Sequence, residues 1–366
     1  MKKVLLTAMA LLTIASTSVF GMYGKGNAWI NFLTDGNQFR ARMDQLGFVL
    51  GNGTIKGTFG FKADRGYLGA ILDANNNGTT TTTDFKPTLS AGIGYTSDVI
   101  GVGVGYNFTY INENLQVHTP VLTLNALNNS IRFVAPIQVA VTDKLGGATG
   151  AKYTGVAFND IQFRYYTGID AFNAVRLFVY YRNNSKEYTA TGIKEVSEAF
   201  GIQARFFFLN TQVGDVNINP YIRVEYHTAL KGATRKQYTA EAEVLGIPDT
   251  LKQSDIYDVS PYEFSIRPVL SLAANSDYVS LYFEPSLGYT LAGSKTKVAA
   301  NQEMSHALTW GAYAELYITP VKDLEWYFEM DVNGNVTGQT AAKANENLAP
   351  VYFETSTGIT WYLPAL

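Results

Sequence analysis

The chain contains two adjacent segments in which apolar residues alternate with small or polar ones: Phe85-Lys-Pro-Thr-Leu-Ser-Ala-Gly-Ile-Gly-Tyr95 and, after a short turn, Val99-Ile-Gly-Val-Gly-Val-Gly-Tyr-Asn-Phe-Thr-Tyr110. A period of two indicates β-strands with one apolar face and one small or polar face. Each segment has about a dozen residues, and a tilted strand needs roughly 9–11 to cross a bilayer. Strands of soluble sandwiches are usually shorter, about 5–6 residues. The hairpin therefore predicts one unit of a transmembrane barrel, apolar side toward lipid and polar side toward the lumen.

The start of the chain indicates export. A basic Met1-Lys-Lys precedes an apolar stretch over residues 4–15, and small residues follow over 16–21, with cleavage expected after Gly21. This pattern is typical of a secretory signal peptide. The chain has no cysteine, which excludes a lipoprotein anchor and disulfide or thiolate chemistry. No later stretch reaches 18 apolar residues, so we expect no transmembrane helix.

The same alternation recurs along the chain and predicts an all-β, antiparallel barrel of about 16 strands, with 14 or 18 as alternatives. The expected strands span residues 39–50 (with a bulge at Gly47), 54–62, 67–73, 85–95, 99–110, 115–127, 131–142, 153–167 (kinked at 159–160), 172–182, 199–209, 216–230, 262–272, 279–291, 308–318, 324–332 and 353–363. Residues 1–21 are the expected signal peptide, 22–38 an N-terminal arm and 39–366 the barrel.

The connections provide an internal check on this strand count. Long polar segments begin near Asp73, Asp143, Asn183, Lys231, Ala292 and Asn333, and an even number of predicted strands separates each successive pair. Outer-membrane barrels have short periplasmic turns and long extracellular loops, which is the alternation this spacing gives. We therefore expect both termini on the periplasmic side. The longest insertion, 231–260, is expected outside with a short helix over 239–245, and 183–196 and 333–350 are the other main surface loops.

Candidate catalytic groups are sparse. The three histidines, His118, His227 and His306, have no second histidine or carboxylate at metal-binding spacing. Ser305 beside His306 leaves an outer-membrane hydrolase as an alternative, but neighbouring strand residues point to opposite faces, so a solvated rim is favoured for these histidines. The Gly101-x-Gly103-x-Gly105 repeat is not followed by a helix, so it predicts small lumen-facing residues rather than a dinucleotide site. We expect no catalytic, cofactor or metal site and no enzyme.

Charge at lumen-phase positions changes sign along the chain. Early positions are mostly basic and later ones mostly acidic, with a mixed boundary at Arg223, Glu225 and Arg267. In a closed barrel this order predicts one basic and one acidic wall around a water-filled pore, and the alternative is that the charges pair and plug the lumen. The candidate pore-lining residues are Arg132, Arg164, Arg182, Arg205, Glu284, Glu315, Glu329 and Asp331.

The first sixty residues resemble a known family. Met22-Tyr-Gly, then Trp29-Ile-Asn-Phe-Leu-Thr-Asp-Gly-Asn-Gln-Phe-Arg-Ala-Arg-Met-Asp-Gln-Leu-Gly-Phe-Val-Leu-Gly-Asn52 and Thr54-Ile-Lys-Gly-Thr-Phe-Gly-Phe61, are similar to the variable surface proteins of Brachyspira (formerly Serpulina) spirochaetes. The resemblance implies an abundant, antigenic outer-envelope protein from a multigene set. It implies neither an enzyme activity nor a defined ligand.

Taken together, these features predict an outer-membrane surface antigen with porin-like passive diffusion of small solutes. An adhesin that binds through its loops over a plugged lumen is the alternative. The expected partners are outer-membrane lipid and, through the loops, host antibodies or surface ligands, and homo-oligomers are left open. The net charge of −3 gives no reason to expect nucleic acid. Charged residues are only 16% of the chain and aromatic residues 13%, which agrees with a membrane barrel.

Overall fold

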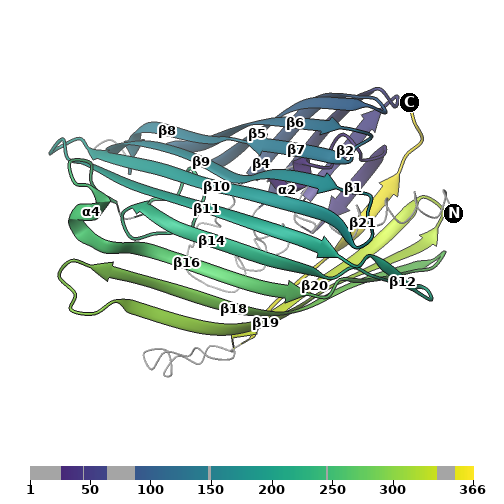
Figure 1. The fold of residues 1–366 in the computed structure, drawn as a ribbon. Helices are drawn as coiled ribbons and strands as arrows, with labels where there is room; N and C mark the ends of the chain where they lie inside the picture. The colour runs from purple at the N-terminus through teal and green to yellow at the C-terminus, as the bar shows by residue number, and fades with distance from the viewer. Residues whose placement is uncertain (1–25, 44, 64–86, 147–149, 245, 336–350) are drawn as a thin grey trace, which may run out of the picture.

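The computed structural model describes residues 26–43, 45–63, 87–146, 150–244, 246–335 and 351–366. Within them the chain forms one closed antiparallel barrel of 16 strands (Figure 1). Four of these strands are each divided into two segments, and β15 (Ile247–Pro248) only adds a short pairing to β11. The expected fold class and strand number are thus confirmed.

The undivided strands are β1 (Gln38–Arg42), β2 (Gln45–Gly51), β3 (Ile55–Ala63), β4 (Pro87–Thr96), β5 (Ile100–Asn112), β6 (Leu115–Ala126), β9 (Ala151–Tyr166), β10 (Phe172–Tyr188), β18 (Val279–Thr296), β19 (Glu303–Val321), β20 (Leu324–Asn335) and β21 (Val351–Tyr362). The divided strands are β7 (Ile131–Pro136) with β8 (Gln138–Leu145), β11 (Lys194–Phe208) with β12 (Thr211–Val213), β13 (Val216–Ile218) with β14 (Tyr221–Lys231), and β16 (Tyr257–Val269) with β17 (Leu272–Asn275). The short helices described are α2 (Gly26–Trp29) and α4 (Gln253–Ile256).

The barrel closes between its first and last strands. β1 pairs antiparallel with β21, from Gln38 opposite Tyr362 to Arg42 opposite Gly358. Beyond β21 the chain continues along the same rim, where the Leu363 amide donates to the Asn37 carbonyl at 2.9 Å. The start of β1 and the C-terminus therefore lie at the same end of the barrel, as the spacing of the loops predicts.

The two faces of the strands differ as the alternation predicts. On β4 and β5 the outward Ile93 and Val104 are 57% and 55% exposed, whereas the inward Ser90 and Asn107 are each 1% exposed. Apolar side chains on the outside can contact lipid without the desolvation cost that polar groups would incur. The polar side chains of the same strands point into the lumen.

The first hairpin differs from the expectation of one strand over 39–50. β1 ends at Arg42 and β2 begins at Gln45, and these two residues are paired across a tight turn. Outward-facing side chains are odd-numbered on β1 and even-numbered on β2, because the turn between the strands has two residues. From the sequence alone, the same change of phase is explained by a bulge at Gly47. The strand expected over 67–73 lies outside the described residues, and β3 pairs directly with β4. Counting β1 and β2 separately keeps the total at 16.

Several expected loops are shorter than the polar composition indicates. β10 continues to Tyr188 and β11 begins at Lys194, so most of 183–196 is strand, and β18 likewise extends to Thr296. Asn, Ser, Lys and Glu extend these strands because both strands continue to pair beyond the apolar belt. The expected kink at 159–160 is confirmed, since Asp160 has a φ of 78° and the register with β10 shifts opposite it.

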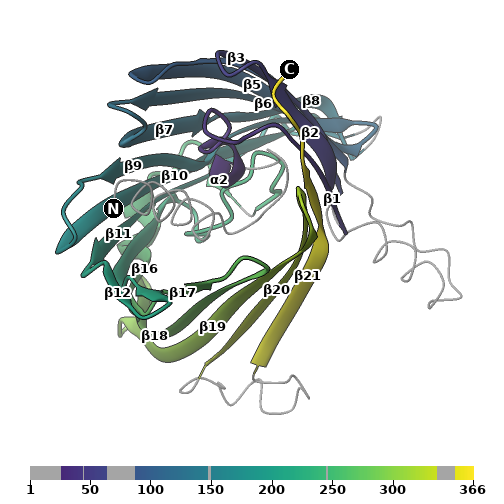
Figure 2. The same cartoon turned by 90° about the vertical axis from the view of Figure 1, so that its right-hand side faces the viewer.

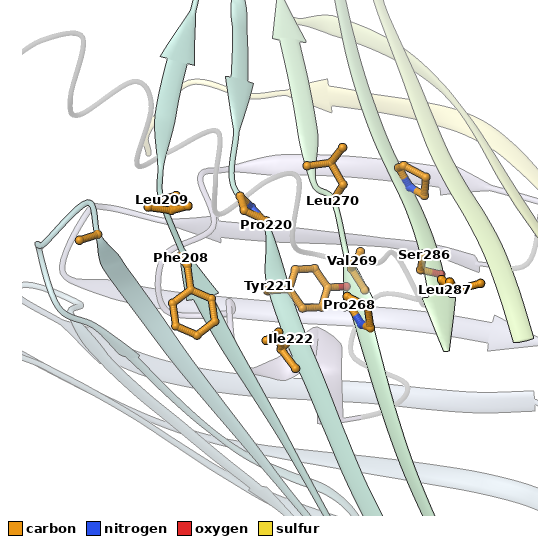
Figure 3. A pocket seen from close by; sticks show the side chains of 12 residues that line it. Phe208, Leu209, Pro220, Tyr221, Ile222, Pro268, Val269, Leu270, Ser286 and Leu287 are labelled. Carbon is orange, nitrogen blue, oxygen red and sulfur yellow. The ribbon is translucent and has the colours of Figure 1, made fainter. Parts of the chain in front are cut away.

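Interruptions in neighbouring strands line up on the outer wall. Pro220, Pro268 and Pro285 come from three adjacent strands and line one apolar pocket of 830 Å³ (Figure 3). The backbone remains bonded across the breaks, because the Phe208 amide donates to the Pro220 carbonyl and the Leu270 amide to the Pro285 carbonyl. The strands therefore tolerate these prolines, since backbone hydrogen bonds are retained beside them. In the described part of the chain, no helix is long and apolar enough to span a membrane.

Candidate functional site: the barrel lumen

The N-terminal arm folds into the barrel (Figure 2). Trp29, Ile30, Phe32 and Leu33, on and just after α2, are at most 2% exposed. They pack as one apolar cluster with inward residues of β2, β6 and β7. The apolar patch that the sequence shows in this arm thus has an intramolecular partner.

Glycines on β4 and β5 form the seat for this arm. A Cβ atom on Gly105 would lie 2.2 Å from Cη2 of Trp29, and one on Gly94 would lie 2.5 Å from Cδ2 of Leu33. Real Cβ atoms do not approach other atoms this closely, so no other residue type fits here without displacing the arm. The glycine repeat is confirmed as lumen-facing, and the structure adds that it accommodates large side chains.

Polar contacts fasten the arm to the wall. The Trp29 indole donates to Asn107 Oδ1 at 3.2 Å, and Arg132 Nη1 donates to Asn31 Oδ1 at 2.9 Å. The Lys56 ammonium on β3 donates to the carbonyls of Leu33 at 3.0 Å and Asp35 at 2.5 Å. These contacts come from strands on both sides of the glycine seat, so they fix the depth of the arm in the lumen.

A second segment enters the lumen from the loop between β14 and β16. Tyr153 on β9 donates its hydroxyl to the carbonyls of Ala240 at 2.7 Å and Ala242 at 3.1 Å. Asn184 on β10 donates to the Thr239 carbonyl at 3.1 Å and the Ala242 carbonyl at 2.8 Å. This part of the insertion was expected outside, with a helix over 239–245, and both expectations are wrong for the described residues. The wall satisfies its carbonyls, so the backbone needs no helical hydrogen bonds here.

The inward loop also covers His227. This residue is 6% exposed; its Nδ1 lies 2.9 Å from the Tyr238 hydroxyl, and its Nε2 lies 3.9 Å from Glu225. The expectation of a solvated rim is therefore wrong for His227, because the loop that follows its own strand, β14, folds back over it. Arg182, another candidate pore-lining residue, donates to Ser197 Oγ and to the Thr234 carbonyl of this loop.

The other basic candidates belong to a single row. Six arginines on adjacent strands lie directly opposite one another in the sheet register, each with its neighbour, from β7 to β16. We call this set the arginine row: Arg132, Arg164, Arg176, Arg205, Arg223 and Arg267. Sequence analysis proposes three of them as pore-lining, places two at a mixed boundary and misses Arg176. The even-numbered phase that Arg176 shares with Arg182 on β10 was the available signal.

The acidic candidates lie on the following strands. Glu315 on β19 is fully buried, directly opposite Glu329 on β20, and accepts hydrogen bonds from the hydroxyls of Tyr313 and, at 2.6 Å, Tyr317. Glu329 forms an ion pair with Arg42 of β1 at 3.3 Å. Glu315 is thus held by two neutral hydroxyls, whereas the charge of Glu329 is compensated by Arg42, so the acidic wall is neutralised in part.

The two remaining acidic candidates, Glu284 and Asp331, interact with residues of the arginine row. Glu284 on β18 accepts a hydrogen bond from the Tyr282 hydroxyl and lies within electrostatic range of Arg176 and Arg205. Asp331 on β20 lies within electrostatic range of Arg267. Basic strands β7 to β16 and acidic strands β18 to β20 thus form two arcs of one wall. Within the described ranges, no group of three or more His, Asp or Glu side chains is arranged to hold a metal ion.

Comparison with models of known protein families identifies the family of this chain. The model of the Serpulina hyodysenteriae variable surface protein family matches residues 2–362. The chain belongs to this family. Family membership and the closed barrel with an apolar exterior make it a surface-exposed outer-membrane β-barrel protein. The resemblance seen over the first sixty residues thus extends over almost the entire chain.

Comparison with solved structures gives matches of low sequence identity. One is entitled a bacterial polysaccharide outer membrane secretin, with 9% identity, a TM-score of 0.46, and coverage of 87% of this chain and 90% of that chain. Another is OmpT of Vibrio cholerae, folded in vitro, with 9% identity, a TM-score of 0.37, and coverage of 89% of this chain and 96% of that chain. A search of curated protein sequences gives no match.

Proposed function

We propose that this variable surface protein is a surface antigen whose lumen also allows passive diffusion of small solutes, and that it is not an enzyme. The observation that carries the pore is the division of the lumen wall into a basic arc from β7 to β16 and an acidic arc from β18 to β20. Fixed charges of opposite sign on facing walls orient and select ions in a water-filled pore. The arm and the inward loop narrow this space, so the proposal is limited to small solutes.

Single-channel recording on the purified mature protein in planar bilayers tests this proposal. We expect a stable conductance and a measurable ion selectivity. Changing four basic residues to glutamine should shift the reversal potential toward cations: Arg132, Arg164, Arg182 and Arg205. Changing the four acidic candidates to amides should shift it toward anions: Glu284, Glu315, Glu329 and Asp331.

Salt dependence gives a second readout from the same recordings. Both shifts should shrink at molar salt, where the screening length falls to about 3 Å from about 8 Å at physiological strength. Insertion without any conductance would contradict the pore.

An adhesin with a plugged lumen is the second candidate function. It is favoured by one observation: two segments, the arm and residues 234–242 of the loop between β14 and β16, are bonded to the inner wall. In this case the inserted protein would not conduct, and it would bind host ligands through the loops at the opposite end from the termini. Conductance and ligand binding measured on the same preparation separate the two functions.

Further aspects of the proposal concern processing and partners. We propose that the signal peptide is removed after Gly21. N-terminal sequencing of the mature protein would test this by giving Met22 as the first residue.

The outer wall of the barrel is proposed to contact outer-membrane lipid, and the long loops are proposed to contact host antibodies. Chemical cross-linking in native membranes would establish whether the barrel forms homo-oligomers.

A further inference from the structure

The arginine row places six like charges side by side. Each arginine lies directly opposite the next, so neighbouring guanidinium groups start from backbones only about 4.8 Å apart. Like charges directly opposite each other destabilise a sheet. A row of this length therefore requires compensation from nearby acidic groups or from a bound anion.

Acidic groups compensate only part of the row. Arg223 forms an ion pair with Glu225, and Arg267 lies within electrostatic range of Glu225 and Asp331. Glu284 lies within electrostatic range of both Arg205 and Arg176. The β14–β16 end of the row is therefore close to neutral.

The other end of the row has neutral contacts only. Arg132 donates to the Asn129 carbonyl at 3.4 Å and to Asn31 at 2.9 Å, and Arg164 donates to Gln162. The nearest carboxylate along β9, that of Asp160, is separated from Arg164 by Gln162 on the same strand face. Arg132, Arg164 and Arg176 surround the Tyr166 side chain. Glu284 is shared between Arg176 and Arg205, so the three arginines still form a cluster of net positive charge.

Two buried nitrogen atoms in this cluster have no hydrogen-bond partner among the described residues. They are Nη1 of Arg164 and Nε of Arg176, in side chains whose residues are 2% and 3% exposed. An unsatisfied buried donor on a charged group costs about 1–3 kcal/mol or more. These donors are available to a ligand with oxygen acceptors.

The row also has a direction along the barrel. Arg132 is one residue from the start of β7, next to the short-turn end, whereas Arg267 is eight residues from the end of β17. Five strand spacings of about 4.8 Å give a row of roughly 24 Å, and barrel strands tilt by about 35–45°. The row therefore climbs roughly 15 Å along the axis, and its least compensated end lies at the mouth that carries the termini.

We propose that Arg132, Arg164 and Arg176 form a binding site for a small oxyanion, such as phosphate or a phosphate ester, at the short-turn mouth of the lumen. The planar fork of guanidinium matches the oxygen pairs of phosphate and carboxylate groups. The remaining arginines extend the site as a spiral along the wall toward the opposite end. This inference rests on the proposed pore only for the passage of the anion, since binding itself needs only the folded barrel.

Calorimetric titration of the mature barrel in nonionic detergent with inorganic phosphate tests the site. We expect saturable binding at low ionic strength, competed by sulfate and only weakly by chloride. Arg164→Gln and Arg176→Gln should each weaken phosphate binding at least about tenfold, as expected for losing one charged hydrogen-bonded pair. Arg164→Lys keeps the charge but not the fork and should also lose affinity.

The matched control is Arg40→Gln, which removes an arginine charge from β1, outside the row, and should leave the phosphate affinity within twofold of the wild type. Heat-dependent gel mobility confirms that each variant is folded. Absence of phosphate binding in the folded wild type would overturn the site, and so would Arg164→Gln and Arg176→Gln variants that bind phosphate as tightly as the wild type.

Conductance measured alongside separates this inference from the pore. Phosphate binding without conductance would leave the site standing and refute diffusion. Conductance by a folded protein that shows no calorimetric phosphate binding would leave the pore standing and refute the site.

Discussion

At the scale of single residues, the lumen is shaped by glycines as much as by charges. Gly92 and Gly105 face the Trp29 ring, and both lie closer to it than a Cβ atom allows. The glycines on β4 and β5 could be assigned to the lumen from alternation alone. Their packing partner could not, because it lies about 70 residues earlier in the sequence and contacts them only in the closed barrel.

Gly105→Ala should displace the arm. The new methyl group would lie 2.2 Å from the Trp29 ring, and overpacking of this kind costs about 1–3 kcal/mol. We expect a red shift in tryptophan emission and faster proteolysis before residue 38, with the barrel still resistant to detergent.

Gly57→Ala on β3 is the control for this change. A Cβ atom at Gly57 has no neighbour closer than 3.9 Å, so this variant should keep the wild-type emission. An unchanged emission spectrum in both variants would contradict the packing of Trp29 against Gly105.

At the scale of elements, the loop between β14 and β16 is divided by its contacts. Residues 234–242 bond to the inner wall, whereas Asp249, Thr250 and Lys252 are exposed. The sequence predicts a long polar insertion at this point but not that half of it turns inward. That choice depends on Tyr153 and Asn184, which belong to other strands.

Tyr153→Phe should loosen this loop. The substitution removes the donor to two carbonyls, a loss of about 0.5–1.5 kcal/mol per hydrogen bond. We expect faster tryptic cleavage at Arg235 and Lys236 and a higher conductance if the lumen is open. Tyr188→Phe, which removes an exposed hydroxyl bonded to Glu195, should change neither quantity.

Single-cysteine labelling should map the two halves of the loop, because the natural chain has no cysteine. On intact cells a membrane-impermeant maleimide should label Thr250→Cys. It should not label Asp98→Cys, which lies in a short turn at the other end, or the buried Tyr238→Cys. Equal labelling at residues 98 and 250 would refute the orientation of the barrel.

At the scale of the whole molecule, the barrel is stabilised by closure and by its match to lipid. Each of the 16 barrel strands pairs with a strand on either side, so the described barrel wall is closed. Closure lets backbone groups pair with one another where lipid offers no partner. We expect the folded protein to resist SDS at room temperature and to change its gel mobility on heating. A circular dichroism spectrum dominated by helix would contradict this fold.

The cost of a charge on the outer face should depend on depth. Ile202 lies near the middle of β11 and is 40% exposed, whereas Ile193 lies in the turn before this strand and is 51% exposed. Ile202→Lys should lower the free energy of unfolding by about 2–4 kcal/mol, and Ile193→Lys by about 0–1 kcal/mol. Denaturant titration of the barrel in lipid vesicles measures both, and equal costs would contradict the membrane position.

The sequence by itself determined the fold class and the common end of the long loops, because period-two alternation is a local property of each strand. It also predicted the total of 16 strands, although the structure divides the expected strand over 39–50 into β1 and β2. Only the tertiary structure decided which side chains share a level of the lumen. Register across strands depends on bulges such as that at Asp160 and on hairpin turns such as that between β1 and β2. One residue of shift changes every cross-strand neighbour. The insertion of the arm and loop likewise depends on shape and hydrogen-bond partners far apart in the sequence, which exist only once the barrel has closed.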